Sequence, residues 1–476
     1  MDLLFVTPEL APFVVETPAA ESIAALAKSL RLLGHDVTIA APRYPAFEQA
    51  GLLAARRLTP LRLQTGAEVV VLDAQLPSGV KLTLFDAPRL FDRSGVYGEN
   101  GEEYADNPKR FGFFSDCVEA LVRSRAEQGK TFDVVHLHDY AAGLCAVKLA
   151  SRPGPSVPTV LTVHDGALTG TFSAKAREEL GIPEEFCHQE GFRIGTKLCV
   201  LKGAVATADR VVTTSPTYAS RLESPERFGA LSRAFREGSA PCVGVLGGVD
   251  YSLYNPATDS ALSSRYDAED ISNKARNKAA VVREVGLEVE VSRPLFFAEA
   301  VSGGQSALDT LAATLRTLAK NELQIVVVTD AAHEEALRAA AEPLTDSVRI
   351  VTRSSDRLVR RLVAGADFYL GLERSNPSAH ALLRAQRYGT VPVALSVDAA
   401  VDAVVDCDAE LETGTGFLFD AMTQRALTGA VARALAAYGS PRFPLLVRRI
   451  ARQDLGWDRA ARRYAQIYRQ TLASHA

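Results

Sequence analysis

The sequence predicts an α/β fold built from two domains, each with its own parallel sheet. Short runs of β-branched and apolar residues alternate with longer helical patterns along almost the whole chain, which is typical of parallel sheets covered by helices on both faces. At 476 residues, the chain is longer than one hydrophobic core usually supports. The two runs of alternation meet near residues 245–290, and each predicts a Rossmann-like, doubly wound sheet.

Strands are expected at the short apolar runs. In the first half these runs are 3–6, 37–40, 69–72, 82–85, 134–136, 159–163 and 211–214. In the second half they are 295–298, 324–329, 348–351, 368–370 and 391–394. Helical periodicity is clearest at 19–33, 110–123, 198–206 and 457–476. The predicted domains are therefore 1–255 and 256–450, followed by a C-terminal helix within 451–476 that packs back on the first domain.

Composition and charge argue against several classes of partner and location. A formal net charge of −4 gives no electrostatic reason to expect a nucleic acid or a membrane surface as partner. No apolar run is long enough to span a bilayer, and the chain enters a strand pattern at Asp2 without a basic secretory leader. The six cysteines are scattered without a C-x-x-C pair, which suits a reducing compartment. We therefore expect a cytoplasmic protein with no metal and no other cofactor.

Sheet geometry predicts where a ligand would bind. In open parallel sheets, ligands occupy the crevice beyond the carboxyl ends of the strands, at the point where the strand order reverses. Two such domains that face each other make the cleft between them the default site. Phosphate groups in such a cleft need glycine-rich loops at helix N-termini, together with Arg or Lys side chains.

A series of motifs runs in order from one end of the chain to the other. Beyond the opening segment 1–42, they are VYGENGEEYADNPKRFGFFS (96–115), FDVVHLHDYAAGL (132–144), LTVHDGALTG (161–170), ADRVVTTSPTYA (208–219), GGVDYSLYNPATD (247–259), NKARNKAAVVREVGL (273–287), AGADFYL (364–370), RYGTVPV (387–393), GTGFLF (414–419) and WDRAARRYAQIYR (457–469). Together they resemble bacterial glycogen synthases and plant starch synthases. The resemblance implies a GT-B fold, with two Rossmann-like domains facing a central cleft. It also implies a retaining glucosyltransferase that moves glucose from ADP-glucose or UDP-glucose onto an α-1,4-glucan without a metal ion.

Several positions that handle the donor in this family are substituted here. The resemblance places two lysines, an arginine and a glutamate at positions that now hold Val15, Ser306, Val301 and Asn376. Thr17 and Pro18 replace a glycine pair, and Val397-Asp398-Ala399-Ala400 replaces a T-G-G-L loop. Thr17 and Pro18 instead suit the start of a helix, with Thr17 as the cap. Loss of a single stabiliser of transition-state charge typically costs about 100- to 1,000-fold in turnover.

These substitutions favour a glycogen synthase-like pseudoenzyme without catalytic residues, for which a sugar nucleotide is not expected as ligand. Its retained role would be to bind an α-glucan or oligosaccharide, or to act as a regulatory or scaffold partner of another protein. The alternative is an active glucosyltransferase with a rearranged donor site, in which new cations replace the missing ones. The candidate cations are Arg353, Arg357, Arg360, Arg361 and Arg374.

The first domain keeps more of the family's acceptor side. The resemblance makes His164, Asp139, Tyr140 and Tyr97 the candidate residues for residual glycan binding. Carboxylates and aromatic faces suit sugars, because hydroxyls bond to carboxylate oxygens while C–H faces pack on rings. A structural interpretation stays open for each of them. Asp139, with the neighbouring His136 and His138, would then only fix a strand end, and Tyr97 would belong to the core.

Overall fold

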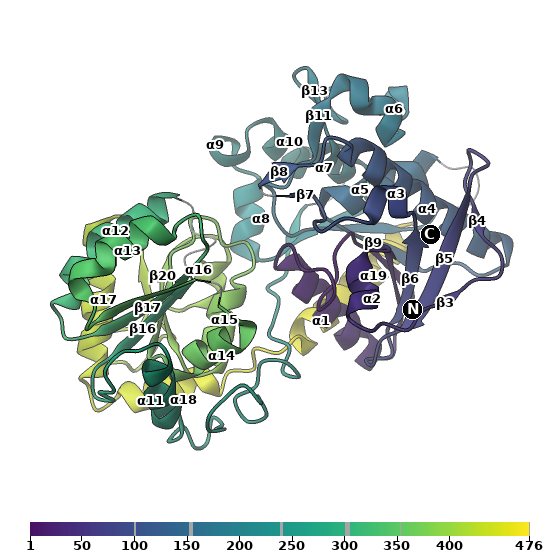
Figure 1. The fold of residues 1–476 in the computed structure, drawn as a ribbon. Helices are drawn as coiled ribbons and strands as arrows, with labels where there is room; N and C mark the ends of the chain where they lie inside the picture. Colours follow the sequence, from purple (N-terminus) through teal and green to yellow (C-terminus); the bar gives the residue numbers. More distant parts are fainter. Residues whose placement is uncertain (100, 152–155, 239–240, 300–304, 353, 476) are drawn as a thin grey trace. The chain divides into compact units, whose positions relative to one another are not determined.

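The chain divides into two compact units (Figure 1). A computed structural model describes residues 1–99, 101–151, 156–238, 241–299, 305–352 and 354–475. The first unit is Met1–Gly247 together with Trp457–Ala476, and the second is Gly248–Gly456. Each unit has its own parallel sheet and its own hydrophobic core. The predicted α/β class is therefore confirmed.

The first unit is built on a large sheet whose central strands are parallel. Its order is β15-β14-β10-β9-β1-β2-β6-β5-β3, with β5 and β3 added antiparallel at one edge and β4 paired to β5. The strands are β1 (Asp2–Val6), β2 (Asp36–Pro42), β3 (Ala55–Arg56), β4 (Leu61–Arg62), β5 (Glu68–Gln75), β6 (Lys81–Asp86), β9 (Val134–His138), β10 (Thr159–Val163), β14 (Arg210–Thr213) and β15 (Val243–Gly244). The chain order reverses between β1 and β9, which are parallel neighbours. The carboxyl ends of these two strands are therefore the expected ligand edge.

Helices pack in two groups around this sheet. One group contains α4 (Asn107–Glu127), α5 (Asp139–Ser151) and α7 (Val200–Thr207), and the other contains α1 (Ala19–Leu32) and α19 (Asp458–His475) (Figure 1). Shorter elements of this unit are α2 (Pro45–Gln49), α3 (Pro88–Phe91), α6 (Arg177–Leu180), α8 (Pro216–Leu222), α9 (Pro225–Phe228), α10 (Ala230–Glu237), β7 (Gly98–Glu99), β8 (Glu102–Glu103), β11 (Thr171–Ser173), β12 (Arg193–Ile194) and β13 (Lys197–Cys199). Leu198 and Cys199, expected to begin a helix, instead pair with β11, so α7 begins two residues later than predicted.

The C-terminal helix α19 belongs to the first unit through a buried aromatic face. The Tyr468 hydroxyl lies 2.8 Å from Nδ1 of His136, and the Tyr464 hydroxyl lies 3.2 Å from Oγ1 of Thr162. Helix α1 lies beside it and buries apolar residues at helical spacing, including Ile23. Residues far apart in sequence thus join one core.

The second unit has a fully parallel sheet in the order β18-β17-β16-β19-β20-β21. Its strands are β16 (Leu295–Glu299), β17 (Gln324–Thr329), β18 (Val348–Thr352), β19 (Phe368–Gly371), β20 (Val391–Leu395) and β21 (Phe417–Phe419). Counted within the unit, this is the strand order of a dinucleotide-binding Rossmann sheet. The order reverses between β16 and β19, so their carboxyl ends define the expected ligand edge.

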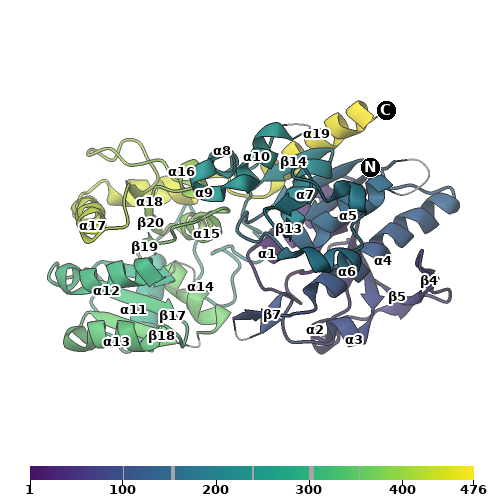
Figure 2. The same cartoon turned by 90° about the horizontal axis from the view of Figure 1, so that it is seen from above.

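Helices cover this second sheet on both faces. One group is α12 (Gln305–Ala319), α13 (Glu334–Ala341) and α17 (Gln424–Tyr438), and the other is α11 (Lys274–Glu284), α14 (Asp356–Gly365), α15 (His380–Arg387) and α18 (Phe443–Ala451), with the short α16 (Ala399–Ala403) after β20 (Figures 1 and 2). The buried amine of Lys274 holds α11 in place by donating hydrogen bonds to Ala364 O (2.9 Å), Tyr388 O (3.1 Å) and Thr390 Oγ1 (2.7 Å). None of the described helices is long and apolar enough to cross a membrane.

The anchoring of α19 gives a stability prediction. Tyr468→Phe should lower the free energy of unfolding of the first unit by about 1–3 kcal/mol, because it leaves the buried Nδ1 of His136 without a partner. Tyr464→Phe is the matched control and should cost less, because Thr162 keeps its 2.7 Å bond to His136 Nε2. Urea unfolding followed by fluorescence of Trp457, the chain's one tryptophan, measures both. Equal losses would contradict the assigned hydrogen bonds.

Candidate functional site

Polar side chains gather at the carboxyl edge of the first sheet, where its strand order reverses. The loop after β1 carries Glu9, the end of β9 leads into Asp139, and His164 follows β10 directly. Parallel pairing of β1 with β9 and of β9 with β10 brings these three chain segments side by side. This edge is the site that the sheet order predicts.

Glu9 organises the loop after β1, although its carboxylate is only 2% exposed. Its Oε2 accepts the backbone N–H groups of Thr17 at 2.8 Å and Glu16 at 3.2 Å. Its Oε1 accepts the hydroxyls of Thr17 at 2.8 Å and Tyr97 at 3.4 Å. Burial raises the pKa of Glu9 to about 7, because the charged form is poorly solvated there. Glu9 is therefore a buried acid that titrates near neutral pH.

The loop that Glu9 holds carries no cation. Val15 is 53% exposed at the position of the family's lysine. Glu16 accepts the backbone N–H of Val96 at 3.0 Å. The hydroxyl of Thr17 accepts the N–H of Ala19 at 3.2 Å. Helix α1 nevertheless begins at Ala19 with Pro18 as its N-cap, one residue later than predicted, so Thr17 is not the cap itself. The segment is thus well ordered as a helix start.

Asp139 fixes the loop that follows β10. Its backbone has a φ of 56°, in the left-handed region, and its Oδ1 accepts the N–H of His164 at 2.7 Å and of Asp165 at 3.4 Å. Burial raises the pKa of Asp139 well above its usual range, against the opposing effect of the N–H of His164. Asp139 therefore ties the end of β9 to the loop after β10 through backbone hydrogen bonds, which is the structural interpretation given for it as an alternative to glycan binding. A non-glycine residue held at positive φ is a form of strain that clusters at functional sites.

His164 lies at this edge as a neutral imidazole. Its ring is half-buried, and its Nε2 is 3.1 Å from Nδ1 of the buried His138. Burial lowers the pKa of His164 to about 4 and holds that of His138 well below its usual range. Neither ring is therefore charged at neutral pH.

The two candidate tyrosines lie together but differ in exposure. The ring centroids of Tyr97 and Tyr140 are 5.7 Å apart, and Tyr97 is half-buried. Tyr140 is 2% exposed and packs edge-on against Phe111, with its ring directly against Gly170, where an added Cβ would come within 2.2 Å. In this structure the Tyr140 ring belongs to the core of the first unit.

The second unit has its own polar cluster at the carboxyl edge between β16 and β19. Glu299 ends β16 and forms an ion pair with Arg384 of α15. Glu373 follows β19 and is 8% exposed. Burial raises the pKa of Glu373 to about 7, the charge of Glu299 adds to this effect, and that of Arg384 opposes it. A neutral acid, an anion and a cation thus meet where the second sheet reverses its order.

The loops at this edge keep glycine-like backbone conformations without glycine. Asp398 has a φ of 47° and Ala379 a φ of 50°, at two positions where the resemblance has glycines. The Asp398 carboxylate accepts the N–H of Asn376 at 2.9 Å and the hydroxyl of Ser375 at 3.1 Å. Asn376 in turn accepts the N–H of Ala379 through Oδ1 at 2.8 Å. A carboxylate and an amide therefore tie together the loops after β19 and β20.

The candidate arginines differ in whether they already form ion pairs within the second unit. Arg360 pairs with Asp356 at 2.7 Å, and Arg361 pairs with Glu284 at 2.8 Å, so both are committed within the second unit. Arg357 and Arg374 are exposed, and Arg374 lies just beyond β19, beside Glu373. Val301 and Arg353, which the sequence analysis singled out, lie outside the described residues, and Ser306 lies in α12 without a described side chain.

Sequence reasoning missed three acids at the two carboxyl edges, of which Glu9 and Glu373 are buried and Glu299 is half-buried. Glu9, Glu299 and Glu373 were not among the candidates, although each stands at or just after the end of an apolar strand. Carboxylates are almost never buried without a role, so a lone acid at the end of such a strand was the available signal.

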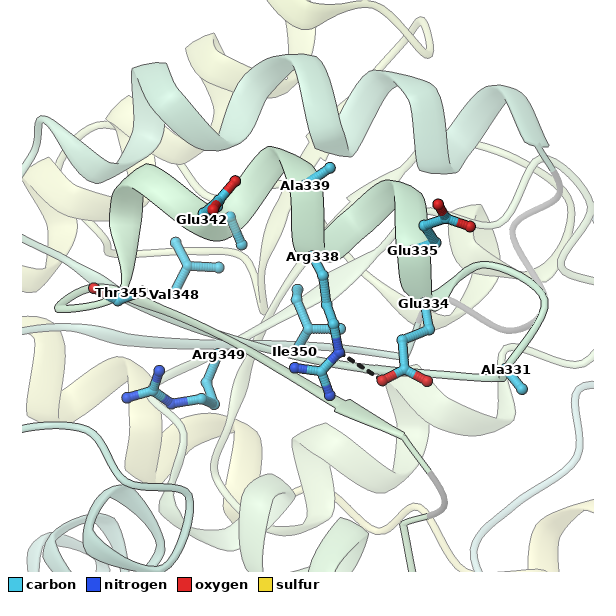
Figure 3. A pocket seen from close by; sticks show the side chains of 11 residues that line it. Ala331, Glu334, Glu335, Arg338, Ala339, Glu342, Thr345, Val348, Arg349 and Ile350 are labelled. Carbon is cyan, nitrogen blue, oxygen red and sulfur yellow. Dashed lines mark hydrogen bonds and ion pairs between the residues drawn. The ribbon is translucent and has the colours of Figure 1, made fainter.

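A cavity of about 610 Å³ lies elsewhere in the second unit (Figure 3). It is lined by α13 and the edge strand β18, with the Glu334–Arg338 ion pair inside it. Its side chains come from the outer edge of the sheet, away from the reversal between β16 and β19. Sheet topology and side-chain chemistry, which favour the carboxyl edges, are the stronger guide to a ligand site.

Comparisons with known proteins give a consistent result. A family model described as the starch synthase catalytic domain matches residues 2–237. The chain is 35% identical over 489 residues to a protein named Glycogen synthase from Thioalkalivibrio sulfidiphilus, covering 99% of this chain and 100% of that one. It is 34% identical to a Glycogen synthase from Anaeromyxobacter dehalogenans, with 99% of each covered.

A solved structure is similar in fold. The catalytic domain of starch synthase IV from Arabidopsis thaliana, bound to ADP and acarbose, matches with a TM-score of 0.88 at 22% identity, covering 99% of each chain. This likeness confirms the predicted GT-B fold class.

The full-length relatives contradict two expectations. The expectation of a pseudoenzyme kept as a glycan-binding, regulatory or scaffold protein is wrong, because relatives named Glycogen synthase match along the whole chain. The expectation that no sugar nucleotide binds is wrong for the same reason. Both expectations were inferred from the loss of charged side chains and glycines at the positions aligned with the family. A comparison of aligned positions overlooks cations and backbone N–H groups that reach a site from other positions.

The buried acid of the first unit gives a pH prediction. Unfolded Glu9 loses its proton near pH 4.5, whereas folded Glu9 keeps it up to about pH 7, so the folded state loses stability as pH rises through this range. Glu9→Gln keeps a neutral side chain and should gain about 2–3 kcal/mol relative to wild type between pH 5 and pH 8. Urea unfolding followed by Trp457 fluorescence measures the difference. A difference that stays constant with pH would contradict a neutral folded Glu9.

Proposed function

Because the chain belongs to the family of bacterial glycogen synthases and plant starch synthases, we propose that it is a retaining glucosyltransferase. It transfers glucose from ADP-glucose or UDP-glucose to the end of an α-1,4-glucan, in the cytoplasm and without a metal ion. The observation that carries the proposal is the identity of 35% along the full length of both this chain and a relative named Glycogen synthase. That similarity spans both units of the chain.

The carboxyl edge of the first unit suits a neutral, hydroxyl-rich acceptor. His164 offers an uncharged imidazole, and Tyr97 offers a half-buried ring whose hydroxyl is held by Glu9. Asp139 acts indirectly, because its carboxylate is used to hold the backbone of His164. Neutral donors and acceptors can exchange hydrogen bonds with sugar hydroxyls without charge to desolvate.

The carboxyl edge of the second unit suits the donor, with a changed set of side chains. Departure of the nucleoside diphosphate builds negative charge that cations and N–H groups must stabilise. Arg374 is the exposed cation closest in sequence to this edge, and we assign it to the phosphates. Glu373, three residues before Asn376, supplies a carboxyl group where the family's glutamate is missing. With a pKa of about 7, it can donate or accept a hydrogen bond with a sugar hydroxyl.

Incorporation of labelled glucose tests the proposal directly. The purified chain, incubated with ADP-[¹⁴C]glucose or UDP-[¹⁴C]glucose and glycogen, should produce label that precipitates with the glycogen. Release of that label by an α-1,4-specific glucosidase would establish the linkage and the retained configuration. Heat-unfolded protein is the control. Incorporation no greater than that control with both donors would overturn the proposed activity.

The assigned phosphate contact gives a separate prediction. Arg374→Gln should lower kcat/KM for the nucleotide sugar about 100-fold, the order expected when one stabiliser of transition-state charge is removed. Arg357→Gln is the matched control, because Arg357 is also an exposed arginine of this unit but lies on α14. It should leave kcat/KM within about twofold of wild type, as ordinary surface substitutions do. Equal effects of the two variants would remove Arg374 from the donor site.

A further inference from the structure

Three histidine rings meet at the carboxyl edge of the first sheet. His136 and His138 point to the same side of β9, with ring centroids 4.2 Å apart, and His164 follows the neighbouring strand β10. The register pairs Thr162 with His138, so His164 lies two residues beyond that pairing. This offset allows the diagonal contact of 3.1 Å between His138 Nδ1 and His164 Nε2.

Each of these imidazoles is neutral, because burial lowers the pKa of all three. A neutral imidazole has one N–H and one bare nitrogen. The bond between His138 and His164 therefore has two arrangements. Either His138 donates from Nδ1 to a bare Nε2 of His164, or His164 donates from Nε2 to a bare Nδ1 of His138.

The surroundings of His138 distinguish these arrangements. Its other nitrogen, Nε2, is buried and has no hydrogen-bond partner in the described part of the chain. The ring lies among the rings of Phe5, at 5.2 Å, and His136, and both nitrogens of His136 are bonded to Thr162 and Tyr468. A buried N–H without a partner is rarer than an unpartnered acceptor. The proton of His138 is therefore better placed on Nδ1, where it has an acceptor.

We infer that His138 is a positioning residue that donates from Nδ1 to His164 Nε2 and so fixes the proton of His164 on Nδ1. His164 then presents an N–H donor to a hydroxyl oxygen of a sugar substrate. Within the described residues, Nδ1 of His164 has no hydrogen bond and is not among the fully buried polar atoms that lack a partner, and His164 as a whole is half-buried. Asp139 holds the backbone of the same residue, so His164 is fixed at two points. The assignment of a sugar rests on the proposed function, whereas the tautomer does not.

Nitrogen NMR of the substrate-free protein tests the tautomers. In protein labelled with ¹⁵N-histidine, protonated and bare ring nitrogens are resolved, and spectra of His138→Asn and His164→Asn assign two of the eight histidines. The expected result at pH 7 is a protonated Nδ1 and a bare Nε2 in both rings. A protonated Nε2 in His138, or an imidazolium in either ring, would overturn the inference. This readout needs no turnover, so it stands or fails separately from the glucosyltransferase activity.

Variants of His138 test whether the tautomer of His164 affects recognition of the glucan. His138→Asn keeps an N–H donor on the atom attached to Cγ and should retain the Nδ1–H form of His164. His138→Leu removes the donor, so His164 should lose the single tautomer, and kcat/KM for the glucan should fall about tenfold, as for loss of one hydrogen bond. Tyr468→Phe disturbs the neighbouring His136 and is the control, with the His164 tautomer unchanged. A fall in kcat/KM that His138→Asn does not recover, or that Tyr468→Phe reproduces, would show a merely structural role.

Discussion

Parallel pairing of β1 with β9 is the constraint on which the carboxyl edge of the first sheet depends. Because the two strands are neighbours in the sheet but far apart in the chain, the loops at their carboxyl ends must meet. Those loops carry Glu9 and Asp139, and pairing of β9 with β10 adds His164. A slip of one residue in this register would turn every side chain of a strand to the opposite face. The apolar strand residues that fix the register therefore also position the polar groups.

Desolvation sets the chemical character of both edges. Burial raises the pKa of Glu9 and Glu373 and lowers that of His164, which moves all three groups towards their neutral forms at pH 7. Neutral hydrogen-bonding groups recognise hydroxyls and avoid the cost of burying an unpaired charge. The buried guanidinium of Arg384 is paired with the half-buried carboxylate of Glu299, as that cost requires. The two edges thus share a preference for polar, uncharged ligand groups, to which the second adds a cation.

Much of the fold could be predicted from the sequence, because hydrophobic periodicity records which faces are buried. The expected strands are observed in both units, and the helices over 19–33 and 457–476 are observed with small shifts. The helix start at Leu198 was wrong, because tertiary pairing with β11 extends that segment into a strand. Local periodicity contains no information on such a partner, which is supplied by residues 25 or more positions away.

The site was harder to predict, because its chemistry depends on burial and on contacts between distant segments. His164 and Asp139 were identified, and the structure joins them through a backbone N–H. The contact of His138 with His164 requires the register of two strands, which the sequence pattern does not specify. Glu9 and Glu373 gain their raised pKa only from the fold around them.

The loops after β19 and β20 show why substituted side chains were a poor guide to the function. At Asp398 and Ala379 the backbone keeps positive φ values that usually require glycine, so the path of the loops is retained although the residues have changed. Such conformations cost of order 1–3 kcal/mol each for a non-glycine residue and persist only when the surrounding structure imposes them. Here the Asp398 carboxylate, bonded to Ser375 and Asn376, contributes that restraint. In such a loop it is the backbone conformation that sets the direction of the N–H groups. A comparison of side chains alone therefore underestimates how much of a phosphate-binding geometry a chain can keep.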